Sequence, residues 1–214
     1  MTLPPSITPD YQRDWPRYFD AVASLGPRDT LIRAAGLHGQ ADPANPPMAV
    51  DIACGEGRDT RELLARGWRV WAFDATCQAI DRLSASVPRD QHHALSARVL
   101  RMEDAAAAED WPGEVALVNA SFALPFCDPA AFPSLWKRIV QCLAPGGRFA
   151  GQFFGDRDEW AVVRPASHWR RAEVDKLFKG FHFEHFEEVE KDGGDALGIT
   201  KHHHLYHIVA RRVG

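Results

Sequence analysis

The stretch VDIACGEGRDT, residues 50–60, decides the fold class. It joins a short apolar run to a loop that carries Gly55 and Gly57, and a segment of helical length begins at Arg58. Glycine lets the backbone adopt positive φ values and approach a ligand closely. In open α/β sheets, ligands bind at the carboxyl ends of the parallel strands. The stretch therefore predicts a ligand-binding turn directly after a buried strand.

The sequence beyond residue 48 alternates short apolar runs with amphipathic stretches. The apolar runs predict strands near 48–53, 68–73, 97–102, 115–120 and 147–154, and the stretches between them predict helices at 57–66, 76–85 and 130–143. This alternation is typical of a parallel sheet covered by helices on both faces. Two further strands, 181–190 and 201–212, are joined by KDGGDALGIT, which is too short for a crossover helix. We therefore expect seven strands with the last one antiparallel.

The chain ahead of this alternation is expected to be helical. Between residues 10 and 24, apolar side chains recur at the spacing of one helical face: Tyr11, Trp15, Tyr18, Phe19 and Val22. A second helix is expected to begin at Pro27 and stop at Gly36. We expect one domain over residues 1–214, with 1–47 as a helical segment that can cover the site and 48–214 as the core.

Composition restricts the possible partners. A net charge of -4 with scattered Lys and Arg argues against a nucleic-acid partner. No apolar run approaches the roughly 20 residues that span a bilayer, and the first residues do not resemble a signal peptide. We expect a cytoplasmic protein with no membrane partner. The four cysteines have neither zinc-site spacing nor disulfide density, so we expect reduced thiols.

Acidic residues around the glycine loop indicate which ligand it binds. The nearest alternative is the dinucleotide fingerprint G-x-G-x-x-G, which holds a pyrophosphate at a helix start. Here Thr60 replaces the third glycine, and Asp51, Glu56 and Asp59 would repel a pyrophosphate. A ligand with an ammonium and a sulfonium would be favoured, by about 4 kcal/mol for unit charges at about 4 Å and an effective dielectric constant of about 20. Asp74 ends the second strand, where it could bond both ribose hydroxyls; a helix cap is the alternative.

These residues resemble the class I S-adenosylmethionine-dependent methyltransferases. VDIACGEGRDT corresponds to the first motif of the family, FDAT to the second, and LAPGGRFAGQFFG to its helix end, turn and fifth strand. The resemblance extends from Tyr11 to Arg212. Within the family, the chain is similar to small bacterial members of the tellurite-resistance and thiopurine-methyltransferase-like branches. It implies a Rossmann-like α/β fold, a seven-stranded sheet with helices on both faces and a reversed last strand. It also implies S-adenosylmethionine as the cofactor.

The resemblance assigns cofactor contacts at each strand end. Asp51 anchors the loop, and Ala53 departs from the glycine that is usual there. Asp104, or Glu103 if the register differs by one, accepts a hydrogen bond from the adenine, and the Ala105 amide donates to it. The expected cofactor-binding residues are Tyr18, Asp51, Ala53, Cys54, Gly55, Glu56, Gly57, Asp74, Ala75, Glu103, Asp104, Ala105 and Asn119.

The acceptor side is less constrained by the sequence. Asn119 and Ser121 are expected at the reaction centre, in a stretch that lacks both prolines of the (N/D)-P-P-(Y/F) motif found in enzymes that methylate adenine or glutamine. Strand alternation puts His202, His204 and Tyr206 on one face, and Lys201, His203 and His207 on the other. Asp156, Asp158 and Trp160 follow the fifth strand and suit a polar organic substrate. The N-terminal aromatic residues could close over the pocket or simply pack on the sheet.

Three functions remain open at this point. We predict methyl transfer to a small-molecule acceptor, with His204 as general base and Asn119 beside the reacting atoms. The alternatives are a non-catalytic S-adenosylmethionine-binding module and a nicotinamide-dependent oxidoreductase. His202 and His204 could ligate zinc, but no acidic or cysteine partner at a suitable spacing accompanies them, so we expect no metal.

Overall fold

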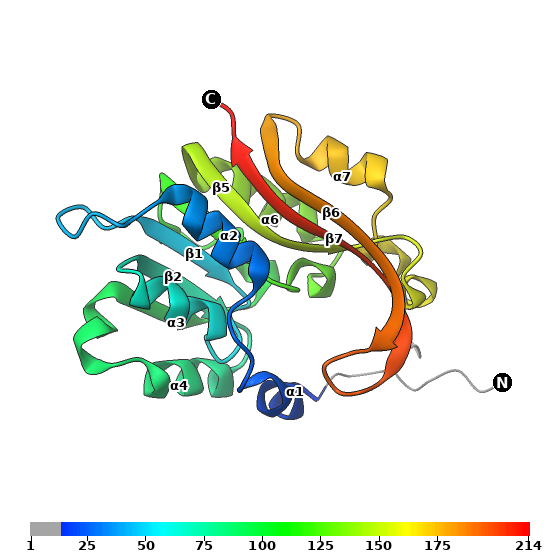
Figure 1. Cartoon of the computed structure of the whole chain (residues 1–214), viewed down its shortest axis with the longest axis horizontal. Coiled ribbons are helices and arrows are strands. Elements are labelled where there is room, and N and C mark those ends of the chain that lie inside the picture. The colour runs from blue at the N-terminus through cyan, green and yellow to red at the C-terminus, as the bar shows by residue number, and fades with distance from the viewer. Residues whose placement is uncertain (1–13) are drawn as a thin grey trace.

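The computed structural model describes residues 14–214, and Tyr11 lies outside them. Its core is one seven-stranded sheet in the order β3-β2-β1-β4-β5-β7-β6 (Figure 1). The strands are β1 Met48–Ile52, β2 Arg69–Asp74, β3 Leu95–Val99, β4 Val115–Ala120, β5 Leu143–Phe154, β6 Phe181–Gly194 and β7 Thr200–Arg212. β7 lies between β5 and β6 and is antiparallel to both. The expected fold class and the reversed last strand are confirmed.

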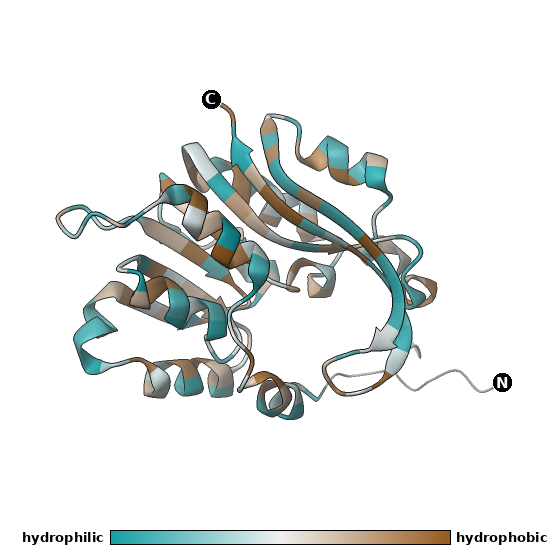
Figure 2. Ribbon diagram, viewed as in Figure 1, coloured by the Kyte–Doolittle hydropathy of each residue, from teal (hydrophilic) through white to brown (hydrophobic). Residues whose placement is uncertain are grey.

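Helices cover both faces of the sheet. They are α1 Trp15–Val22, α2 Asp29–His38, α3 Arg58–Ala65, α4 Cys77–Ser86, α5 Met102–Ala105, α6 Phe132–Cys142 and α7 Arg171–Leu177. Side chains of α2, α3 and α4 form one apolar core with the sheet, and those of α5, α6 and α7 form the other. Figure 2 shows hydrophobic residues interspersed with hydrophilic ones along α4, as expected for a helix with one buried face.

The central strands are buried on both sides. Four of the five β1 residues and five of the six β2 residues are buried, which explains why these segments read as continuous apolar runs. The part of the chain from residue 14 onward also contains four short 3₁₀ helices: η2 Arg89–Ala94, η3 Leu124–Phe126, η4 Glu159–Val162 and η5 Pro165–Ser167. Among residues 14–214, no helix combines the length and the apolar character needed to cross a membrane.

Several expected boundaries were wrong. β5 begins at Leu143 rather than at residue 147, and β6 continues to Gly194 rather than ending at residue 190. The second helix begins at Asp29 and continues through Gly36 to His38. A side chain at Gly36 would meet no atom within 4 Å, and the turn that ends α2 is instead made by Gly39, with a φ of 91°. The third strand was placed at 97–102 but ends at Val99, because the residues from Met102 form the helical turn α5.

Candidate active site

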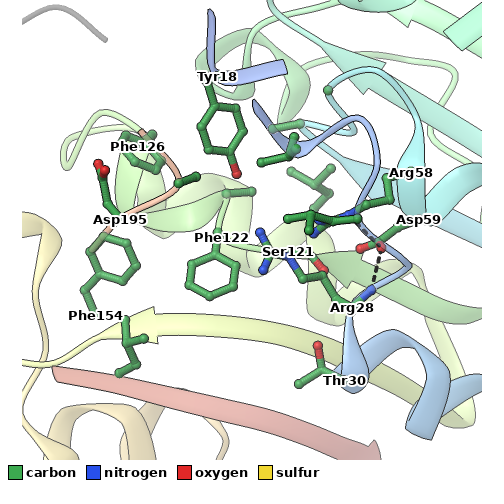
Figure 3. A pocket seen from close by; sticks show the side chains of 18 of the residues that line it. Tyr18, Arg28, Thr30, Arg58, Asp59, Ser121, Phe122, Phe126, Phe154 and Asp195 are labelled. Atoms are coloured by element: carbon green, nitrogen blue, oxygen red, sulfur yellow. Dashed lines mark hydrogen bonds and ion pairs between the residues drawn. The ribbon is translucent and has the colours of Figure 1, made fainter. Parts of the chain in front are cut away.

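A cavity of about 950 Å³ opens at the carboxyl ends of the parallel strands (Figure 3). Its volume lies at the upper end of the range for pockets that hold one drug-sized ligand. The expected cofactor residues that line it are Tyr18, Asp51, Ala53, Cys54, Gly55, Glu56, Asp74, Ala75 and Glu103. The lining does not include Gly57, Asp104, Ala105 or Asn119. Among the expected residues, the cavity therefore brings together Tyr18 of α1 and residues at the ends of three neighbouring strands.

The glycine loop turns sharply into α3. Ala53, Gly55 and Gly57 have φ values of 50°, 56° and 86°, so the alanine keeps the left-handed turn that the family usually builds with glycine. Gly55 and its neighbours face the cavity, whereas Gly57 faces α4. A Cβ atom at Gly57 would lie 2.2 Å from Leu83 Cδ1. Gly57 therefore allows α3 and α4 to pack closely, and its role in the site is indirect.

Asp74 ties the end of β2 to this loop. Its Oδ2 accepts a hydrogen bond of 3.0 Å from the Gly55 amide. Its Oδ1 accepts from the backbone amide and the hydroxyl of Thr76, both at 3.0 Å. Thr76, in turn, caps α4. A carboxylate has about four lone-pair sites, so Asp74 can support this turn and still accept hydrogen bonds from a ligand in the cavity.

A buried pair of carboxylates lies behind the loop. The Asn119 amide nitrogen donates to Asp51 Oδ1 at 2.9 Å and to Asp59 Oδ2 at 3.0 Å. The Thr60 hydroxyl donates to Asp51 Oδ2 at 2.5 Å, and the Arg28 amide donates to Asp59 Oδ1 at 2.9 Å. Burial, followed by the nearby charge of Asp59, raises the pKa of Asp51 to about 7. The pair provides negative charge that a cationic ligand would stabilise.

Asn119 therefore has a different position from the one expected. It is fully buried, both hydrogens of its amide are used by the two carboxylates, and its Oδ1 accepts from the Ser121 hydroxyl at 3.1 Å. The cavity is lined by Ser121 instead. The structure thus corrects the expectation that Asn119 faces the reacting atoms: this residue holds the acid pair.

One of the two candidate acids after the third strand borders the cavity. Glu103 lines the cavity, whereas Asp104 is exposed and is not among the lining residues, and Ala105 is buried. Glu103 Oε1 accepts from the Asp128 amide at 3.0 Å. Partial burial opposes ionisation of Glu103, but this bond and Arg101 outweigh it and lower its pKa. Glu103 is thus an ionised acceptor at the cavity edge.

The histidines of β7 alternate as expected, but the face that meets the cavity carries Lys201, His203, Leu205 and His207. His204 lies on the opposite face with no exposed surface. Its Nε2 lies 2.9 Å from Glu188 Oε1, and its Nδ1 accepts from the Arg157 amide at 3.1 Å. The choice of His204 as base is corrected, because its ring does not reach the cavity. Residues 14–214 contain no group of three or more side chains suited to hold a metal.

Aromatic side chains form the wall opposite the glycine loop. Phe122, Phe126, Phe154 and Trp160 line this part of the cavity. Trp15 of α1 packs edge-on against Phe126, with ring centroids 5.3 Å apart. Lys201 pairs with the buried Asp158 and lies 4.1 Å from the centroid of the Trp160 ring. The aromatic face of α1 thus covers the cavity together with the hairpin between β6 and β7 (Figure 1).

Two arginines that were not expected at the site, Arg28 and Arg58, also line the cavity. Arg58 directly follows Gly57, so its place beside the loop could have been inferred. Burial, and next the charge of Arg28, lower the pKa of Arg58, which indicates that the two guanidinium groups are near each other. Arg28 comes from the start of α2, and nothing in its local sequence indicates that it reaches the cavity.

Comparisons with known proteins agree with this geometry. Residues 49–147 match a methyltransferase domain family. An uncharacterized methyltransferase of Synechocystis sp. is 33% identical over 104 residues, which span 47% of this chain and 44% of that protein. The matched stretch is thus less than half of either chain.

Solved structures resemble the chain over most of its length. TehB from Haemophilus influenzae gives a TM-score of 0.72 at 16% identity, covering 91% of this chain and 65% of that one. The 1,6-didemethyltoxoflavin-N1-methyltransferase of Burkholderia thailandensis gives 0.60 at 19% identity, covering 94% and 80%. At such identities, these likenesses concern the fold.

Proposed function

We propose that this chain, which its fold and residues 49–147 place among the class I S-adenosylmethionine-dependent methyltransferases, transfers a methyl group to a small-molecule acceptor. The family match confirms the resemblance inferred from VDIACGEGRDT and FDAT, and this family uses S-adenosylmethionine. The observation that carries the proposal is the cavity itself. In this cavity, the glycine loop with its acidic side chains and the Asp74 carboxylate face an aromatic chamber, which is the part lined by Phe122, Phe126, Phe154 and Trp160.

The residues present fit this cofactor. The left-handed turn from Ala53 to Gly57 exposes backbone to the cavity, where an amino acid moiety would lie. The buried carboxylates of Asp51 and Asp59 would balance its ammonium group. Asp74 would accept hydrogen bonds from the ribose, and Glu103 from the adenine amino group. When bound, S-adenosylmethionine supplies an already activated methyl group, so the protein mainly has to align the acceptor.

His207 is the side chain that we propose as general base. It lines the cavity, and its ring centroid lies 6.1 Å from that of Phe122, which follows the end of β4. Burial lowers the pKa of His207 from 6.5, so the imidazole is neutral at pH 7 and can accept a proton. An acceptor that arrives as a hydroxyl or ammonium needs such a base, whereas a carboxylate or thiolate does not.

A calorimetric titration tests the cofactor assignment. We expect S-adenosylhomocysteine to bind and NADH not to bind, because the acids around the loop repel a pyrophosphate. Asp74→Ala should weaken S-adenosylhomocysteine binding about tenfold or more, the size of one hydrogen bond to a charged group. Asp81→Ala, on the exposed side of α4, is the control. Unchanged affinity in Asp74→Ala would remove Asp74 from the site.

Turnover separates an enzyme from a binding module. Acceptors sorted into thiols, carboxylates, amines, hydroxyls and metalloid oxyanions can be screened by the release of S-adenosylhomocysteine. We expect at least one class to be methylated. Tight cofactor binding without turnover in any class would favour the non-catalytic alternative.

A further inference from the structure

The cavity contains a cation that no carboxylate neutralises. Lys201 pairs with Asp158, and Arg58 Nε lies 4.0 Å from Asp59 Oδ1. Within residues 14–214, by contrast, the Arg28 side chain has no ion-pair partner, and its Nε is buried without a hydrogen bond. Only the backbone amide of Arg28 bonds Asp59. A buried donor without a partner is costly, so a ligand group that accepts hydrogen bonds would stabilise this site.

The guanidinium of Arg28 lies on the aromatic side of the cavity. Its Cζ is 4.4 Å from the centroid of the Phe122 ring, and Figure 3 shows the side chain extending from the Asp59 region toward that ring. The Phe122 ring in turn contacts Phe154 and His207, with centroids 6.3 and 6.1 Å away. These neighbours belong to β5 and β7, not to the loop after β1. The guanidinium of Arg28 therefore lies beside the aromatic residues of the cavity.

Phe122 is itself held in place. Its amide donates to Gln152 Oε1 at 2.9 Å, and Gln152 Nε2 donates to the Thr30 hydroxyl at 2.9 Å. Phe122 adopts a φ of 53°, a backbone conformation that such bonds must maintain. The guanidinium therefore lies over a ring that is fixed in place. In this position it can direct its planar fork of N–H groups toward a bidentate acceptor in the cavity.

We propose that the methyl acceptor is an aromatic carboxylate whose carboxylate group binds Arg28. The fork of N–H groups matches a carboxylate in geometry and charge. The body of the acceptor would lie against the aromatic residues that line the same chamber: Phe122, Phe126, Phe154 and Trp160. This inference rests on the proposed function, because it specifies the substrate class of that site.

Matched pairs of ligands test the proposal. Protein saturated with S-adenosylhomocysteine is titrated by calorimetry with benzoate and benzamide, and with 4-hydroxybenzoate and 4-hydroxybenzamide. We expect each carboxylate to bind at least about tenfold more tightly than its amide, the size of one charge-assisted hydrogen bond. Arg28→Gln should abolish this preference, and Arg28→Lys should restore only part of it because lysine lacks the planar fork.

Controls distinguish the possible failures. Arg69→Gln removes an exposed arginine at the start of β2, at the opposite end of the strand from the cavity, and should keep the preference. Arg28→Gln should bind S-adenosylhomocysteine as the wild type does, which also shows that the variant is folded. Equal binding of carboxylate and amide by the wild type, or loss of S-adenosylhomocysteine binding in Arg28→Gln, would overturn the proposal. Wild-type protein that failed to bind S-adenosylhomocysteine but kept an Arg28-dependent carboxylate preference would instead refute the proposed function.

Discussion

Replacing Asp51 with asparagine should remove a pH-dependent cost to stability. The side chain of Asp51 is 1% exposed and receives hydrogen bonds from Thr60 and Asn119. The Asp51→Asn side chain can still accept from the Asn119 amide through its oxygen and donate to the Thr60 hydroxyl through its nitrogen. The substitution therefore keeps the size and most of the hydrogen bonding, and it removes the charge.

The magnitude follows from the pKa of Asp51, which is raised from 3.8 to about 7. One pKa unit corresponds to about 1.4 kcal/mol, so ionising this carboxyl costs up to about 4 kcal/mol more in the folded protein than in the unfolded chain. Because the folded state holds its proton more tightly, the associated stability is present below about pH 4 and is lost as the pH rises through about 7.

Urea unfolding of both proteins, followed by circular dichroism at pH 5, 6, 7 and 8, measures this effect. Relative to wild type, Asp51→Asn should gain free energy of unfolding as the pH rises from 5 to 7 and little more by pH 8, because only the wild type loses stability by ionisation and that loss is nearly complete above its folded pKa. The difference between the free energies of unfolding of the two proteins removes the contributions of groups that titrate alike in both. Asp81→Asn, an exposed carboxylate on α4, should show a constant difference. A difference between Asp51→Asn and wild type that is the same at pH 5 and pH 8 would refute the argument.

Two further predictions concern packing and the histidine strand. Gly57→Ala should lower the free energy of unfolding by about 2 to 5 kcal/mol, because it combines a left-handed backbone with a clash against Leu83. Gly36 lies in open space within α2, so Gly36→Ala should be neutral or stabilising by up to about 1 kcal/mol in the same urea assay. A loss of stability in both variants would contradict this assignment. An NMR titration should place the His207 imidazole below its ordinary pKa of 6.5, with the signal assigned from its absence in His207→Gln; a midpoint at or above that value would argue against a neutral base.

The fold was predictable because its signals are local. The apolar run before Gly55, the helical segment after it and the short connection between the last two strands each follow from neighbouring residues. The positions of Asp74 and Glu103 beside the cavity were predictable for the same reason, since strand ends meet at one edge of a parallel sheet. The end of the third strand was not predicted correctly, because the few residues of the helical turn at Met102 cannot be distinguished from a strand end.

The remaining site residues depend on contacts between distant segments. Asn119 reaches Asp51 across 68 positions of sequence, so its role as a bridge between two acids was not visible. Alternation separated His204 from His207 correctly, but it does not determine which face of β7 meets the cavity. That choice follows from the position of β7 between β5 and β6 and from the helices that cover the other face.

Arg28 supports Asp59 through its main chain and not through its side chain, because the backbone amide is the group that donates to the Asp59 carboxylate. Every amino acid except proline carries this N–H group, so nearly any substitution at position 28 preserves the support of Asp59. The Arg28 side chain makes no bond to Asp59, so a substitution can change its charge, length and shape without removing this support. If the Arg28 side chain binds the acceptor as proposed, a substitution at this position should change acceptor binding and leave the main-chain support of Asp59 in place.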